Sequence, residues 1–139
     1  MDGTVTLLVA LQFAAFGWRI NREITVGDEE RRTWFPVADY VNVIMLFLTI
    51  SCCIVIPLVF GSFGTLKKMV LVAAAILLAF HPITTAGHYG LITKRGREYY
   101  ADPEEDYPYT TREEIVCFVI SIIITAFFVL YIYKYSPSI

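Results

Sequence analysis

The sequence predicts an all-α integral membrane protein: a four-transmembrane-helix bundle with a short first span and both termini on the same side. The first observation is composition, because only 17% of the 139 residues are charged, against roughly 25% in a typical soluble domain. The second is that charged residues are absent from four long windows. The third is the length of these windows, since about 20 apolar residues cross a hydrocarbon core of about 30 Å. The whole chain, 1–139, is predicted to be a single membrane domain.

The four windows without Asp, Glu, Lys or Arg contain 16, 27, 25 and 19 residues and cover 3–18, 40–66, 69–93 and 115–133. We predict spans at about 3–20, 36–60, 68–92 and 114–134, with polar connections at 21–33 and 93–113. The first window reaches only about 24 Å at 1.5 Å per residue. We extend it to Ile20 and expect the Arg19 side chain to reach the lipid headgroups.

The first span has two alternative interpretations. A cleaved signal peptide needs a basic segment before its apolar stretch. This chain begins Met-Asp-Gly, and Arg19 and Arg22 follow the apolar stretch. We therefore predict a retained helix, with an interfacial helix as the alternative.

The ends of the other spans carry recognisable signals. The second span follows the aromatic and proline segment 33–36, and the third follows the glycine-containing turn 61–65. The segment Thr110–Glu114 contains two overlapping capping-box spacings and predicts the start of the fourth span. Three tyrosines in 131–135 resemble an interfacial aromatic belt at its end.

Positive charge is divided unevenly between the two sides of the predicted bundle. The first and third connections carry eight basic residues: Arg19, Arg22, Arg31, Arg32, Lys94, Arg95, Arg97 and Arg112. The opposite side carries three: Lys67, Lys68 and Lys134. Because positive residues favour the cytoplasmic side, we predict that connections 21–33 and 93–113 are cytoplasmic and that the termini lie on the other side.

Each predicted span has one polar face. Polar residues in hydrocarbon are costly, so these faces should turn towards one another inside the bundle. In the first span, the polar residue on this face is Gln12. The predicted intramembrane cluster, with either a transport or a structural role, comprises Asp39, Asn42, His81, Thr84, Thr85, His88, Cys117 and Ser121.

Residue depth leads to a specific hypothesis for this cluster. Counted from the predicted span ends, Asp39 and His88 lie at a similar level, and His81 lies deeper. We therefore expect Asp39 to pair with His88, with His81 further along a proton or ion path. The alternative is structural: Asp39 lies at headgroup depth, and the histidines bond to Thr or backbone oxygens.

No cofactor is predicted, although a metal or haem site is a third possibility, with Asp39, His81 and His88 as candidate ligands. The two histidines lie about 10.5 Å apart along one helix, because seven residues separate them. They therefore cannot bind one haem iron from opposite sides. A haem would need a histidine from another chain, and a small metal site would need Asp39 or Cys117 to complete it.

The third connection is the one sizeable aqueous segment. An acidic stretch around Pro103 is flanked by tyrosines, which resemble anchors for a partner protein. The alternatives are a solvated linker or a weak divalent-ion site. The candidate docking residues are Tyr99, Tyr100, Tyr107 and Tyr109.

The functional prediction is a small polytopic membrane protein that acts as a non-catalytic subunit or accessory protein of a larger membrane complex. Its partners would be the lipid bilayer and other membrane subunits or copies of itself. The net charge of −2 gives no support for nucleic-acid binding. The alternatives are a small oligomeric proton-coupled transporter or channel that uses the Asp/His face, and a metal- or haem-binding subunit.

Overall fold

The computed structural model describes residues 3–28, 35–61, 64–101 and 110–135, apart from the side chains of 26–28 and 99–101. Four helical segments in this part of the chain are long and apolar enough to cross a membrane, and the described residues contain no strand. The predicted all-α four-helix membrane bundle is confirmed. The candidate spans are Gly3–Thr25, Val37–Phe60, Gly64–His88 and Arg112–Tyr135.

The helix boundaries differ from the predicted ones in three places. Helix α1 (Gly3–Asp28) continues well past Ile20, so the first span is not short. Helix α4 (Gly64–His88) begins and ends four residues earlier than the predicted span 68–92. A further helix, α5 (Lys94–Ala101), occupies part of the third connection.

The second span has an irregular centre. It consists of α2 (Val37–Ile50), the π-helical η1 (Ser51–Val55) and α3 (Ile56–Phe60). Pro57 follows the π-helical turn and has no amide hydrogen to donate, so the regular hydrogen-bond pattern cannot continue through it. Gly61 ends the span with a φ of +89°, a conformation that favours glycine.

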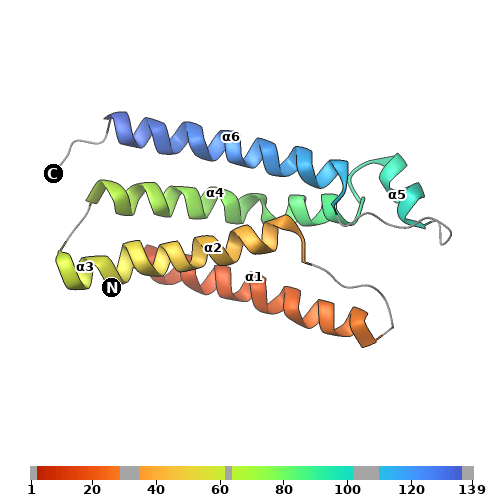
Figure 1. Ribbon diagram of the computed structural model, residues 1–139, viewed down its shortest axis with the longest axis horizontal. Coiled ribbons are helices and arrows are strands. Elements are labelled where there is room, and N and C mark those ends of the chain that lie inside the picture. The colour runs from red at the N-terminus through yellow and green to blue at the C-terminus, as the bar shows by residue number, and fades with distance from the viewer. Residues whose placement is uncertain (1–2, 29–34, 62–63, 102–109, 136–139) are drawn as a thin grey trace.

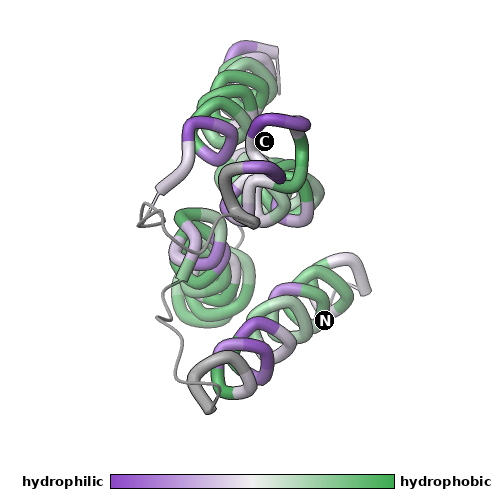
Figure 2. Tube along the Cα trace, turned by 90° about the vertical axis from the view of Figure 1, so that its right-hand side faces the viewer, coloured by the Kyte–Doolittle hydropathy of each residue, from purple (hydrophilic) through white to green (hydrophobic). Residues whose placement is uncertain are grey.

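The helices lie in an open row in the order α1, α2, α4, α6 (Figures 1 and 2). The fourth span, α6 (Arg112–Tyr135), packs mainly on α4, which packs on α2, and α2 packs on α1. The start of α1 and the end of α6 lie at the same end of the molecule's long axis (Figure 1). Helix α5 lies at the opposite end, which we call the α5 end of the row. This arrangement brings the end of α1, the start of α2, the end of α4 and the start of α6 to one end of the molecule.

The apolar core lies between the middle of the helices and the end of the molecule opposite α5. Leu8, Met45 and Ala74 from three neighbouring helices are buried against one another. Most other large apolar side chains of the spans are exposed, as expected for helices that contact lipid. The polar side chains gather at the α5 end of the row, and this is where the candidate site lies.

Candidate functional site

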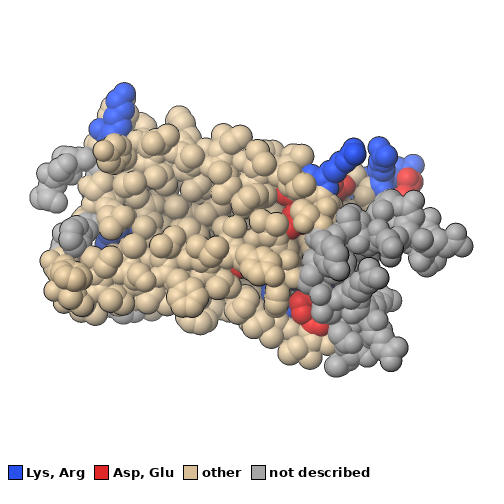
Figure 3. Space-filling view, viewed as in Figure 1, with Lys and Arg blue, Asp and Glu red and all other residues tan. Residues whose placement is uncertain are grey.

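Five ionisable side chains are buried at the α5 end of the helix row. They come from all four spans and have exposed fractions of 6% or less: Arg19, Asp39, His81, His88 and Glu114. Figure 3 shows charged side chains gathered at this end and an uncharged surface along the middle of the visible face. Burial of charges in an apolar environment is costly unless they are paired, so the pairing of these five residues defines the site.

Asp39 is the centre of the first cluster. Arg19 Nε donates to Asp39 Oδ2 over 2.7 Å, and His81 Nε2 lies 2.7 Å from Asp39 Oδ1. Asp39 is 1% exposed and Arg19 is fully buried. Both carboxylate oxygens therefore have a partner, and the three residues connect α1, α2 and α4.

Glu23 and Tyr89 extend this cluster towards the end of the row. Arg19 donates through Nη2 to Glu23 over 2.8 Å and through Nη1 to the Tyr89 hydroxyl over 2.9 Å. The Tyr89 hydroxyl in turn donates to Glu23 over 3.0 Å. Burial raises the pKa of Tyr89 above its ordinary value, against the opposing effect of Arg19. Tyr89 therefore keeps its proton at neutral pH, so its hydroxyl can accept from Arg19 and donate to Glu23 at the same time.

Glu114 is the centre of the second cluster. Its Oε2 lies 2.8 Å from His88 Nδ1, and its Oε1 accepts a hydrogen bond of 2.7 Å from the backbone amide of Val37. Val37 is the first residue of α2, where free amides and the helix dipole favour a negative charge. Glu114 therefore connects α6 to both α4 and α2.

A close contact between α4 and α6 supports the second cluster. The Thr111 hydroxyl donates to the Gly87 carbonyl over 2.5 Å and accepts from the Glu114 amide over 3.0 Å. A Cβ atom at Gly87 would lie 2.9 Å from the Glu114 nitrogen. Glycine at this position is what allows the two backbones to approach so closely.

The predicted helix cap at the start of α6 is half present. Thr111 caps the helix as expected, but the Glu114 side chain turns to His88 instead of back to the cap. The Glu113 side chain also points away from the cap, and it accepts hydrogen bonds from the backbone amides of Ile92 and Thr93. The two glutamates therefore hold the α4 end and the following turn.

The expected pairing of Asp39 with His88 is wrong. Asp39 pairs with His81 and Arg19, and His88 pairs with Glu114. The physical reason is the end of α4: because the helix ends at His88 and not near residue 92, His88 lies level with the first residue of α2. His81 then lies deeper, level with Asp39.

The expectation that Arg19 reaches the lipid headgroups is also wrong, because Arg19 is buried against Asp39. Sequence reasoning also missed Glu114 as a member of the site. Helical spacing held a signal for both. Gln12 and Arg19 are seven residues apart, as are Glu114 and Ser121, which places each charged residue on the polar face of its helix.

A layer of uncharged polar groups lies deeper than Asp39. Asn42 Nδ2 donates to the backbone carbonyl of Gln12 over 3.0 Å, which joins α2 to α1. Within the described residues, both side-chain amide atoms of Gln12 and Asn42 Oδ1 are buried in this layer without a hydrogen-bond partner, and so is Thr85 Oγ1, one helical turn nearer the α5 end than His81. Such groups are costly in an apolar interior, so this layer is the part of the site with unused hydrogen-bonding capacity.

The remaining predicted cluster residues have local roles. Thr84 and Ser121 are buried, and their hydroxyls donate to the carbonyls of Phe80 and Phe118 in their own helices. Cys117 is half-buried and forms no disulfide bond within the described residues.

The predicted docking tyrosines divide into two groups. The backbone of Tyr99 and Tyr100 belongs to α5. Tyr107 and Tyr109 lie outside the described residues.

The three candidate metal ligands lie in different clusters. Asp39 and His81 are together, whereas His88 is held by Glu114. Among the residues that the structure describes, no group of three or more His, Cys, Asp or Glu side chains is arranged to hold a metal ion.

The two clusters differ in their charged members. In the first, two arginines, Arg19 and Arg22, lie beside two carboxylates, Glu23 and Asp39. In the second, one histidine, His88, lies beside one carboxylate, Glu114. The arrangement therefore stabilises helix contacts through charge, and it also places two histidines, residues that titrate near neutral pH, beside buried carboxylates.

Comparisons with protein-family models, curated proteins and solved structures found no match to this chain.

Proposed function

We propose that this chain is a non-catalytic subunit or accessory protein of a larger membrane complex. The observation that carries the proposal is the open row of helices, in which the buried charges bind the chain's own spans to one another at one end. The two faces of the row are left apolar, and they are available to other membrane helices.

Helix α6 is the part of the row that we assign to a partner. It stands at the edge of the row and buries a smaller share of its span than the other three helices. Its exposed face carries a stripe of large side chains at helical spacing: Val116, Ile120, Ile123, Phe127 and Leu130. Packing against a partner helix would bury this stripe, and such packing depends on close side-chain fit.

The orientation of the chain is part of the same proposal. The end that holds the buried charges would face the cytoplasm, because connections 21–33 and 93–113 carry most of the basic residues. In this orientation α5 lies on the cytoplasmic side, where it could contact peripheral parts of the complex.

The test is co-purification from native membranes in mild detergent, with Ile123→Ala/Phe127→Ala as the variant and Leu58→Ala as the control. Leu58 is 80% exposed and lies on α3, away from the α6 stripe. We expect partner subunits in a fixed ratio with the wild-type and control proteins, and their loss from the α6 variant. A wild-type chain that purifies without stoichiometric partners contradicts the proposal.

A second candidate is a small oligomeric proton-coupled transporter or channel. The observation that favours it is the buried Asp39–His81 contact of 2.7 Å, followed by the unpartnered atoms of Gln12 and Asn42 one layer deeper. A titratable pair next to unused hydrogen-bonding groups is the kind of arrangement that can pass a proton within a membrane.

Proton flux into vesicles that contain the purified chain separates the two candidates. The second candidate expects flux from the chain alone and its loss in His81→Gln, with His88→Gln as the control histidine from the other cluster. Flux that is equal to that of empty vesicles rejects this candidate and leaves the first one standing.

A further inference from the structure

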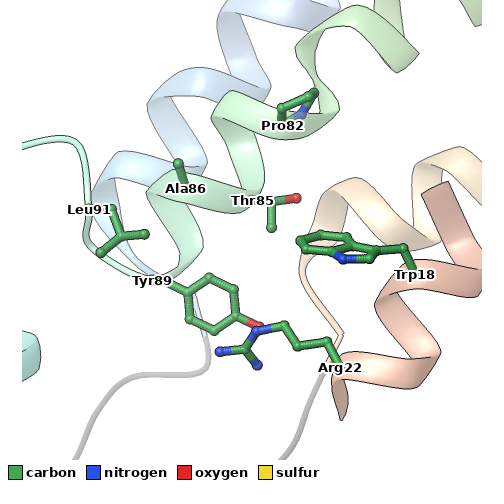
Figure 4. Close-up of a pocket in the computed structure, with 7 residues that line it drawn as sticks. All are labelled: Trp18, Arg22, Pro82, Thr85, Ala86, Tyr89 and Leu91. Carbon is green, nitrogen blue, oxygen red and sulfur yellow. The ribbon is translucent and has the colours of Figure 1, made fainter. Parts of the chain in front are cut away.

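A pocket of about 330 Å³ opens between the end of α1 and the end of α4, beside the first cluster (Figure 4). Its lining changes along the membrane normal. Arg22 and Tyr89 lie at the outer end, and Pro82 lies about 10.5 Å deeper than Tyr89, because seven residues of α4 separate them. The pocket therefore has an arginine at its mouth, in contact with Glu23, and an apolar floor.

Thr85 places an unused hydroxyl between these two ends. It is 6% exposed, lines the pocket, and its Oγ1 has no hydrogen-bond partner. Other buried threonines behave differently: the hydroxyls of Thr49, Thr84 and Thr125 each donate to the carbonyl four residues earlier. Oγ1 is itself buried, and in Figure 4 the methyl group of Thr85 points towards the space between Tyr89 and Trp18. A turn of the side chain about its Cα–Cβ bond would present the unused hydroxyl to a molecule in the pocket.

Arg22 supplies the charge at the mouth. Its guanidinium stacks on the Tyr89 ring, 4.3 Å from the centroid, and Nη1 lies 3.5 Å from Glu23. Glu23 already accepts shorter hydrogen bonds from Arg19 and Tyr89. An Arg22 side chain that is one-third exposed and fixed by stacking is well placed to bind an anion from the lipid–water boundary.

We propose that this pocket binds one anionic glycerophospholipid. The phosphate lies at Arg22, an ester carbonyl below it accepts a hydrogen bond from Thr85, and the start of an acyl chain lies against Pro82 and Trp18. The order of cation, hydroxyl donor and apolar surface along α1 and α4 matches the order of groups in such a lipid. Trp18 is exposed on the lipid side of the pocket, an ordinary position for an interfacial tryptophan. This inference is independent of the proposed subunit role.

Native mass spectrometry of the purified chain, titrated with phosphatidylglycerol, tests the site. The comparisons are Arg22→Gln, Thr85→Val and the control Arg95→Gln, which removes the same charge from an exposed position at the same end. We expect one tightly bound lipid per chain, an affinity about tenfold lower in Arg22→Gln and several-fold lower in Thr85→Val, and no change in the control, in line with the loss of a charge-assisted and a neutral hydrogen bond.

Three results would overturn the assignment. The first is an equal loss in Arg22→Gln and Arg95→Gln, which indicates attraction to general positive charge. The second is unchanged binding in Ala86→Trp, which fills the pocket, provided that this variant keeps the wild-type melting temperature. The third is equal affinity for phosphatidylcholine with the same acyl chains, or displacement of the lipid by inorganic phosphate alone, since the proposal requires both the anionic phosphate and the apolar tail.

Discussion

The two halves of the helix row are held together in different ways. At the α5 end, five hydrogen bonds or ion pairs that involve Arg19, Asp39, His88 or Glu114 join helices to one another or to the residue that follows α4. In the other half, Leu8, Met45 and Ala74 make apolar contacts. Lipid tails are as apolar as these side chains, so burial against a neighbouring helix brings little hydrophobic gain there. Specific pairing of the helices must therefore come mainly from the charged end.

The comparison predicts the largest loss of stability for Asp39→Leu. This change leaves Arg19 and His81 buried without their common partner, and removal of one member of a buried pair costs about 3–5 kcal/mol. The measurement is the free energy of unfolding in bilayers or mixed micelles. A loss below about 1 kcal/mol would mean that water or lipid headgroups replace Asp39 at little cost.

Glu114→Gln is predicted to have the next largest effect. Glutamine can still accept the Val37 amide, but it removes the negative charge beside His88. We expect a loss of about 1.5–3 kcal/mol, the range for hydrogen bonds to charged groups. Glu113→Gln is the matched control, because its hydrogen bonds are exposed and should contribute less. Equal losses of unfolding free energy in the two variants would mean that the buried Glu114 contributes no more to stability than the exposed Glu113.

Gly87→Ala tests the close approach of α4 and α6. The added Cβ meets backbone atoms that cannot turn away, so the helices must separate and strain the His88–Glu114 contact. We expect a loss of about 1–3 kcal/mol. Gly17→Ala has open space around its Cβ and should be neutral or slightly stabilising. Equal stability of the two variants would mean that the close approach of α4 and α6 does not depend on glycine at position 87.

Met45→Ala is predicted to have the smallest effect of the four. It removes packing atoms from the apolar half, but lipid or neighbouring side chains can fill the space, so we expect a loss of about 1 kcal/mol or less. The same unfolding measurement applies. A loss as large as that of Asp39→Leu would show that the apolar half determines helix pairing.

The sequence was sufficient to predict the four spans, because charge-free windows of membrane length have few other interpretations. It also predicted which residues face inward, since Asp39, His81 and His88 are all buried. Pairing could not be predicted in the same way. An error of four residues at the end of α4 equals about 6 Å along the axis, enough to exchange His81 and His88 as the partner of Asp39.

Arg19 and Glu114 show a second limit. Each lies near the end of a span, where a charged side chain can reach the headgroups or turn into the bundle, and composition does not distinguish these positions. The choice depends on which partner lies opposite, and that is set by the arrangement of all four helices. Hydropathy therefore predicts the spans, whereas side-chain geometry between helices determines the site.

A double-mutant cycle between Arg19 and Asp39 tests most directly whether buried charge pairs the helices. The variants are Arg19→Met, Asp39→Leu and the double substitution, each compared by free energy of unfolding. We predict that the double variant is less destabilised than the sum of the single variants by about 2 kcal/mol or more, because each single change leaves a buried charge without its partner. Losses that simply add would contradict the account.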